Sequence, residues 1–198
     1  MMMRVLVVDD ERLARKELRR LLAGHLHLEI VGEAAGVADG IAKAAALAPD
    51  LILLNVQMPD GSGFDLLDAL DDVPEVILTT GHGPCQADYL LKPIHPQRLA
   101  AALERAAVRT GMGKKPRRLF IRDGERCWFV RLTDIRLFEA DGRHTRIYFD
   151  GGSPLIARPL SLLEEIARSA AILPRQQPPS GQPGRRRPHR TNSRRLAR

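Results

Sequence analysis

The segment DLILLNVQMPDG, residues 50–61, gives the clearest indication of the fold of the first half of this chain. It is an apolar run that ends at Asn55 and is followed by a Met-Pro-Asp-Gly turn. An unbroken apolar run of this length is typical of a strand buried on both faces, as in a parallel sheet covered by helices. In such sheets ligands bind at the carboxyl ends of the strands. We therefore expect a parallel α/β fold with Asn55 at its functional edge.

The sequence around this stretch alternates between strand-like and helix-like segments. Apolar strands are expected at RVLVVDD (4–10), LEIVGEA (28–34), EVILTT (75–80) and DYLLKP (88–93). Helices with one apolar face are expected over 11–22, from Val37, around Phe64–Leu70 and from Pro96 toward Gly111. Alternating elements of this kind predict a doubly wound sheet with helices on both faces.

Polar residues stand at the ends of four of these strands. Asp9 and Asp10 follow the first strand, Asn55 the third, Thr80 the fourth and Lys92 the fifth. Because parallel strands end at one edge, we expect these side chains to converge. Two adjacent carboxylates suit Mg²⁺, while a hydroxyl and an ammonium suit a phosphoryl group.

The motifs VLVVDDE, DLILLNVQMPDGSGFDLL, VILTT and DYLLKP together resemble a response-regulator receiver domain of bacterial two-component signalling, over about residues 3–108. The resemblance implies a flavodoxin-like doubly wound fold. It also implies Mg²⁺ binding by Asp9 and Asp10, a sensor histidine kinase as partner, and phosphorylation of an Asp at position 55. Thr80 and Lys92 would contact the phosphoryl group, and Tyr89 would move with the switch.

Asn55 departs from that pattern. A carboxamide lacks the anionic oxygen that attacks phosphorus, because its nitrogen lone pair is delocalised into the carbonyl. The change also removes one negative charge from the metal site, so Mg²⁺ binding should weaken. Either the chain works without phosphate, or it is an acceptor-dead form, natural or engineered. The only reaction that the pocket suggests needs the missing acid, so an enzyme is not expected.

The segment GHGPCQA, residues 81–87, is a second departure. Parallel strands are normally joined by a crossover of about a dozen residues or more. The fourth helix of the receiver is therefore expected to be missing, which would expose apolar side chains on one sheet face. In receivers this helix, with the last strand and helix, commonly pairs two chains, so a homodimer is one expected assembly.

Residues 110–118, TGMGKKPRR, have the composition of a linker, and short β-rich runs with Asp-Gly turns follow. The order of elements over about 117–170 resembles the first half of a LytTR-type DNA-binding output domain, a small, mostly-β module. This implies promoter DNA as a partner. The loop DGRHTR offers Arg143, His144 and Arg146 for contacts with phosphates or base edges.

The last 28 residues, 171–198, carry 8 Arg and no acidic residue, so they account for more than the net charge of +7. This Pro- and Arg-rich tail shows no apolar periodicity and is expected to be disordered. It is either a basic arm or, as we slightly favour, a frameshifted end. Cys85 and Cys127 are isolated in sequence, and a disulfide framework or zinc site is not expected.

The predicted organisation is a receiver domain at 1–109, a linker at 110–118, a partial LytTR-type domain at 119–170 and a tail at 171–198. The predicted function is control of transcription by a phosphorelay response regulator whose acceptor is lost. One alternative is a receiver-like interaction module that no longer binds specific DNA. Another is a nonspecific nucleic-acid binder that uses only the tail. With no apolar stretch near the ~20 residues of a membrane span, we expect no membrane partner and a cytoplasmic location.

Overall fold

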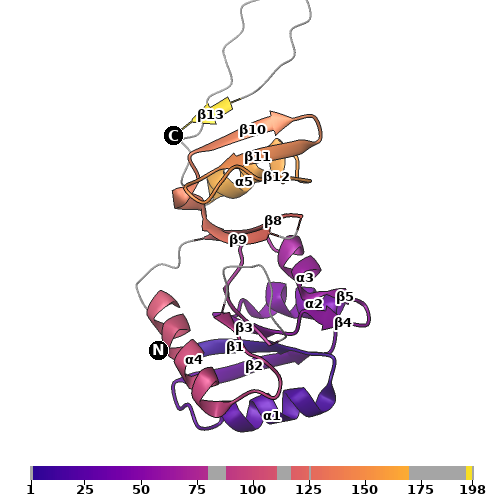
Figure 1. Ribbon diagram of the computed structural model, residues 1–198, viewed down its shortest axis with the longest axis vertical. Coiled ribbons are helices and arrows are strands. Elements are labelled where there is room, and N and C mark those ends of the chain that lie inside the picture. The colour runs from indigo at the N-terminus through magenta and orange to yellow at the C-terminus, as the bar shows by residue number, and fades with distance from the viewer. Residues whose placement is uncertain (1, 80–87, 111–116, 125, 170–194, 198) are drawn as a thin grey trace, which may run out of the picture. The chain divides into compact units, whose positions relative to one another are not determined.

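The computed structural model describes residues 2–79, 88–110, 117–124, 126–169 and 195–197 (Figure 1). The chain divides into two compact units, Met1–Phe129 and Val130–Arg198, which are described separately below. Among the described residues, no helix is long and apolar enough to cross a membrane.

The first unit is built on a five-stranded sheet with the order β2-β1-β3-β6-β7. All four neighbouring pairs are parallel. The strands are β1 Met3–Val8, β2 Leu28–Ala34, β3 Leu51–Leu54, β6 Glu75–Leu78 and β7 Asp88–Tyr89. This is the flavodoxin-like strand order, so the predicted fold class is confirmed.

Within the described part of this unit, four helices cover the two faces of the sheet: α1 Arg12–Leu22, α2 Val37–Leu47, α3 Gly63–Ala69 and α4 Pro96–Thr110. Side chains of β3 alternate between the faces, as the two-residue period of a strand requires. Leu51 and Leu53 pack with apolar residues of α1 and α4, whereas Ile52 and Leu54 pack with those of α2 and α3. All four β3 side chains are fully buried, as its unbroken apolar sequence predicted.

A small hairpin that the sequence did not predict follows Asn55 and leads into α3. It consists of β4 Gln57–Met58 and β5 Gly61–Ser62. Ser62 caps α3, and a Cβ atom at Gly63 would lie 2.5 Å from the Asn55 carbonyl oxygen. Asp60 accepts a hydrogen bond from the Ala38 amide at 3.4 Å, at the start of α2. The loop after the acceptor position is therefore held by both helices.

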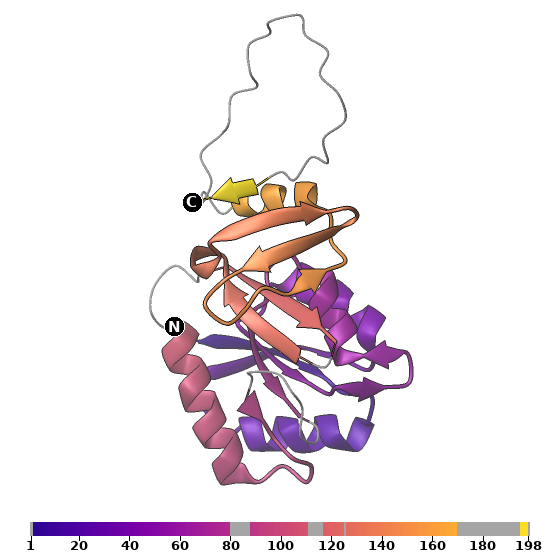
Figure 2. The same cartoon turned by 45° about the horizontal axis from the view of Figure 1, so that its top comes forward.

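A pair of antiparallel strands, β8 Arg118–Asp123 and β9 Arg126–Arg131, lies next to α3 (Figures 1 and 2). Residues of this pair up to Phe129 belong to the first compact unit, although the sequence placed them in the output domain. The expected exposure of one sheet face is wrong for the described residues. Val76 and Leu78 of β6 are 3% and 0% exposed, because side chains of β8 and β9 pack in the same cluster.

Cys127 on β9 is buried and disulfide-bonded, which its isolated position in the sequence did not predict. Whether two distant cysteines pair depends on the distance between them in the fold, which sequence spacing does not give. Cys85, the chain's other cysteine, lies outside the described residues, as does nearly all of the short segment that joins β6 to β7.

The second unit contains a sheet with the order β12-β11-β10-β13. Its elements are the 3₁₀ turn η1 Leu132–Asp134, β10 Leu137–Asp141, β11 His144–Tyr148, β12 Leu155–Ile156, α5 Leu160–Ser169 and β13 Arg195–Ala197. The mostly-β character expected after the receiver is confirmed. Residues 195–197 differ from the expected disordered tail, because they pair with β10, whose outer edge is otherwise open to another strand. Residues 170–194 lie outside the described part of the chain.

Candidate functional site

Four of the predicted site residues meet at the carboxyl edge of the parallel sheet. Asp9 and Asp10 follow β1, Asn55 follows β3, and Lys92 follows β7. The backbone N–H of Asn55 donates to the Val8 carbonyl at 2.8 Å, so the ends of β1 and β3 are in register at the site. Asp9 is fully buried, and Asn55 is 5% exposed. The predicted convergence of strand ends therefore places a buried carboxylate and a buried amide side by side.

Lys92 bridges two carboxylates. Its Nζ lies 2.9 Å from Asp9 Oδ2 and 2.8 Å from Glu11 Oε1. Burial lowers the pKa of Lys92, but hydrogen bonds and charge interactions with Glu11 and Asp9 more than offset this and leave the pKa above its ordinary value. Lys92 is therefore a fixed positive charge that neutralises the buried Asp9.

The Asn55 side chain is oriented by two acceptors. Its Nδ2 donates to Asp10 Oδ1 at 2.9 Å and to the Gln57 carbonyl at 2.7 Å. Both partners accept hydrogen bonds only, so the amide nitrogen, and not the oxygen, must face them. A carboxylate at position 55 would instead point an anionic oxygen at two acceptor oxygens.

The donor set does not fit a metal ion well. Asp9 already accepts from the Glu11 amide at 2.9 Å and pairs with Lys92, while Asp10 accepts from Asn55. Within the described residues no group of three or more His, Cys, Asp or Glu side chains is arranged to hold a metal. Mg²⁺ prefers several oxygen ligands in octahedral geometry, and here the side-chain nitrogen of Asn55 already donates to Asp10 Oδ1 and to the Gln57 carbonyl.

The remaining receiver positions are distributed as follows. Thr80 lies outside the described residues. Its neighbour Thr79 is fully buried, and its hydroxyl has no hydrogen-bond partner among the described residues. Tyr89, at the end of β7, is partly buried against the same apolar cluster as β6. The role of Tyr89 in a switch stays a prediction.

The structure adds groups to the site that the sequence did not point to. Glu11 holds Lys92, and Arg15 Nη1 donates to the carbonyls of Asp9 and Asp10 at 2.7 and 3.1 Å. Helical spacing could have revealed Arg15, because it lies four residues after Glu11 and so on the same face of α1. The Gln57 carbonyl carries no signal in the sequence, since any residue has one.

The predicted DNA-contacting residues lie at a second place, the hairpin of β10 and β11. Gly142, with a φ of 62°, and Arg143 form a two-residue turn, and His144 begins β11. Arg143 and His144 are exposed, and their side chains make no hydrogen bond or ion pair with any described residue. Arg146 differs, because its guanidinium donates to the Ser153 carbonyl at 3.0 Å. Arg143 and His144 are thus two exposed side chains at the turn of this hairpin, and their role in DNA binding stays a prediction.

A parallel sheet of this strand order, with an acidic pair after β1 and a lysine after β7, defines a receiver-type α/β domain. Residues 5–104 match the family model described as the response regulator receiver domain. The chain belongs to the response-regulator receiver domain family.

Relatives agree with this assignment. The chain is 30% identical over 168 residues to the sensory transduction protein LytT of Enterococcus faecalis, covering 75% of this chain and 69% of that protein. It is 40% identical over 114 residues to the transcriptional regulatory protein BtsR of Salmonella typhi, covering 52% and 48%. The signal receiver domain of the putative Luxo repressor protein of Vibrio parahaemolyticus matches with a TM-score of 0.50 and 26% identity, over 57% of this chain and 95% of that one. The chain spans about half the length of most curated relatives it matches.

Proposed function

We propose that this chain is a LytTR-type response regulator that controls transcription by binding promoter DNA, without phosphoryl transfer to residue 55. One observation carries the proposal: the Asn55 amide nitrogen donates to Asp10 Oδ1 and to the Gln57 carbonyl. The amide satisfies both oxygens without a cation and has no nucleophilic oxygen for phosphorus. The hydrogen-bonding groups at position 55 are thus satisfied within the protein, and Mg²⁺ should bind weakly at most.

The proposed partners follow from the family and the relatives. We propose a cytoplasmic location for this chain and a sensor histidine kinase as the partner that docks on its receiver, with no phosphate reaching residue 55. Promoter DNA is the proposed target of the second unit, supported by the name of the relative BtsR and by the exposed Arg143 and His144.

Phosphorylation tests the first half of the proposal. With acetyl phosphate and Mg²⁺, the unmodified chain should remain unlabelled, and Asn55→Asp should gain Mg²⁺-dependent labelling at residue 55. The acid needs the cation, because its oxygens face the Asp10 carboxylate and the Gln57 carbonyl. The matched control is Gln57→Glu, which adds the same charge on an exposed neighbouring side chain. Stable labelling of the unmodified chain at residue 55 would contradict the proposal.

DNA binding tests the second half. Arg143→Ala should weaken the preference for one promoter fragment over a scrambled fragment by about 1–3 kcal/mol if Arg143 contacts a base. Arg136→Ala, an exposed residue paired with Asp150, is the control. Replacing Arg185, Arg186 and Arg187 by Gln should lower binding to both fragments equally and reduce its salt dependence. If only the tail substitutions have an effect, the interaction is nonspecific and promoter control is excluded.

A further inference from the structure

The chain between β6 and β7 is short for a connection between parallel strands. Strands β6 and β7 are parallel, yet only residues 79–87 join them. A parallel crossover usually takes about a dozen residues or more and contains a helix. Nevertheless Leu78 is fully buried, and Tyr89 is partly buried in the same apolar cluster.

The strands β8 and β9 provide apolar side chains to this cluster. Phe120 and Cys127 are each 2% exposed, and Phe129 packs beside them. The Phe120 ring stacks on Phe64 of α3, with centroids 5.8 Å apart and planes 6° apart, and lies 5.3 Å from the Phe129 ring. Aromatic pairs at such distances contribute beyond the area that they bury. These strands therefore pack on the receiver through a continuous apolar contact.

Arg118 fixes the start of β8 to the segment before β6. The Arg118 amide donates to Asp72 Oδ1 at 3.1 Å, and the Val73 amide donates to the Arg118 carbonyl at 3.0 Å. The Arg118 guanidinium donates to the carbonyls of Val73 and Pro74 and, at 2.7 Å, to Glu75 Oε2. The Arg118 side chain is only 14% exposed, so these contacts satisfy a charge that is nearly removed from water.

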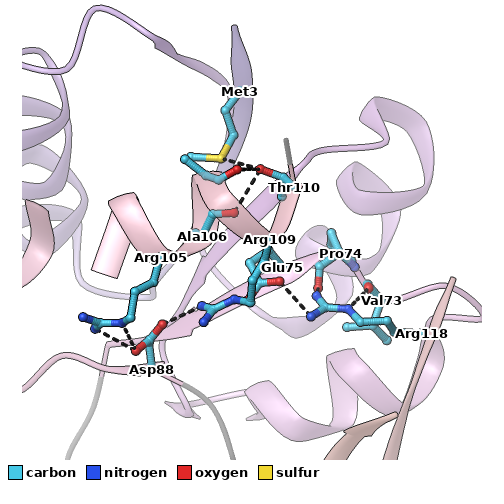
Figure 3. Close-up of polar contacts among 11 residues, drawn as sticks. Met3, Val73, Pro74, Glu75, Asp88, Arg105, Ala106, Arg109, Thr110 and Arg118 are labelled. Carbon is cyan, nitrogen blue, oxygen red and sulfur yellow. Dashed lines mark hydrogen bonds and ion pairs between the residues drawn. The ribbon is translucent and has the colours of Figure 1, made fainter. Parts of the chain in front are cut away.

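The Glu75 carboxylate also joins this contact to α4, as Figure 3 shows. Glu75 Oε1 accepts from Arg109 of α4 at 2.6 Å, and Arg109 also donates to Asp88 Oδ2 of β7 at 2.6 Å. Arg105 donates to the other Asp88 oxygen at 2.9 Å. Alternating charges thus join β8 to β6, α4 and β7 in one network (Figure 3).

We propose that residues 117–124 and 126–129 are a built-in cover of the receiver, which occupies the sheet face that a helix between β6 and β7 would otherwise cover. The receiver therefore extends to Phe129. This holds whether or not the second unit binds DNA.

Hydrogen exchange of the full-length chain tests this proposal. Phe120→Ala should speed exchange of the Leu66 and Leu67 amides of α3 and of the β6 amides by about tenfold or more, while α5 is unchanged. The matched control Phe138→Ala removes a buried ring of β10 and should speed exchange in the second unit alone. Each variant is measured with and without reductant, because Cys127 is disulfide-bonded.

The proposal is overturned if Phe120→Ala leaves α3 and β6 within about twofold of the unsubstituted chain under reducing conditions. Should that variant fold too poorly to measure, Arg118→Lys gives the same decision. Lysine keeps the charge but loses the forked donors to Val73 and Glu75, so exchange in β6 should rise and exchange in α5 should not.

Discussion

The two faces of the receiver sheet are covered in different ways. One face packs against α1 and α4, whose apolar residues recur at helical spacing and belong to the receiver motif itself. The other packs against α2 and α3 and also against β8 and β9, which follow the receiver motif in the chain. An apolar sheet face must therefore be covered, but the element that covers it can come from outside the receiver motif.

The largest expected loss of stability comes from truncating one buried side chain on each face of the sheet. Phe120→Ala should lower the free energy of unfolding by about 3–5 kcal/mol and Leu99→Ala on α4 by about 2–5 kcal/mol, since both side chains are buried. Urea denaturation of the full chain, followed by circular dichroism, measures both. A loss below about 1 kcal/mol for Phe120→Ala alone would mean that the two faces are not equivalent.

A smaller loss of stability is expected when the ion-pair network that joins β8 to α4 is broken. Glu75→Gln leaves Arg109 and Arg118 without their shared carboxylate and should cost about 1–3 kcal/mol, because Glu75 is 8% exposed while Arg109 is partly open to water. The control is Glu104→Gln on the exposed side of α4. Equal stability losses for the two variants would show that the network adds nothing to the packing.

The smallest expected effect is the pH-dependent contribution of Asp88 to the stability of the fold. Burial raises the pKa of Asp88, but hydrogen bonds and charge interactions with Arg105 and Arg109 more than offset this and leave it below the ordinary 3.8. The folded state therefore binds the proton less readily than the unfolded chain. The contribution to stability is complete above pH 3.8 and is lost as the pH falls through the lower pKa of the folded state.

Asp88→Asn should accordingly be less stable than the parent at neutral pH by less than about 1 kcal/mol, as for other partly exposed pairs, and the gap should close in acid. Thermal unfolding between neutral pH and about pH 3 measures the gap. A gap that does not change with pH would assign the loss to packing instead of charge.

Most of the first unit could be predicted from the sequence because its signals are local. The apolar run before Asn55 predicted a buried strand, and strand ends predicted the meeting of Asp9, Asp10, Asn55 and Lys92. The orientation of the Asn55 amide could not be predicted, since it depends on a backbone carbonyl. The position of β8 and β9 was missed because their apolar residues would pack equally well in either unit, and only tertiary contact decides.

The packing of Phe120 on Phe64 also bears on how this protein can be taken apart and recombined. Output modules are commonly exchanged between signalling proteins by cutting at the apparent linker, here residues 110–118. A chimaera cut there would carry a receiver with a bare aromatic patch, prone to self-association. The junction that keeps the receiver whole lies after Phe129, inside β9. In this chain the boundary between exchangeable modules is therefore set by which residues are buried together, and not by the Gly- and Pro-containing segment that looks like a linker.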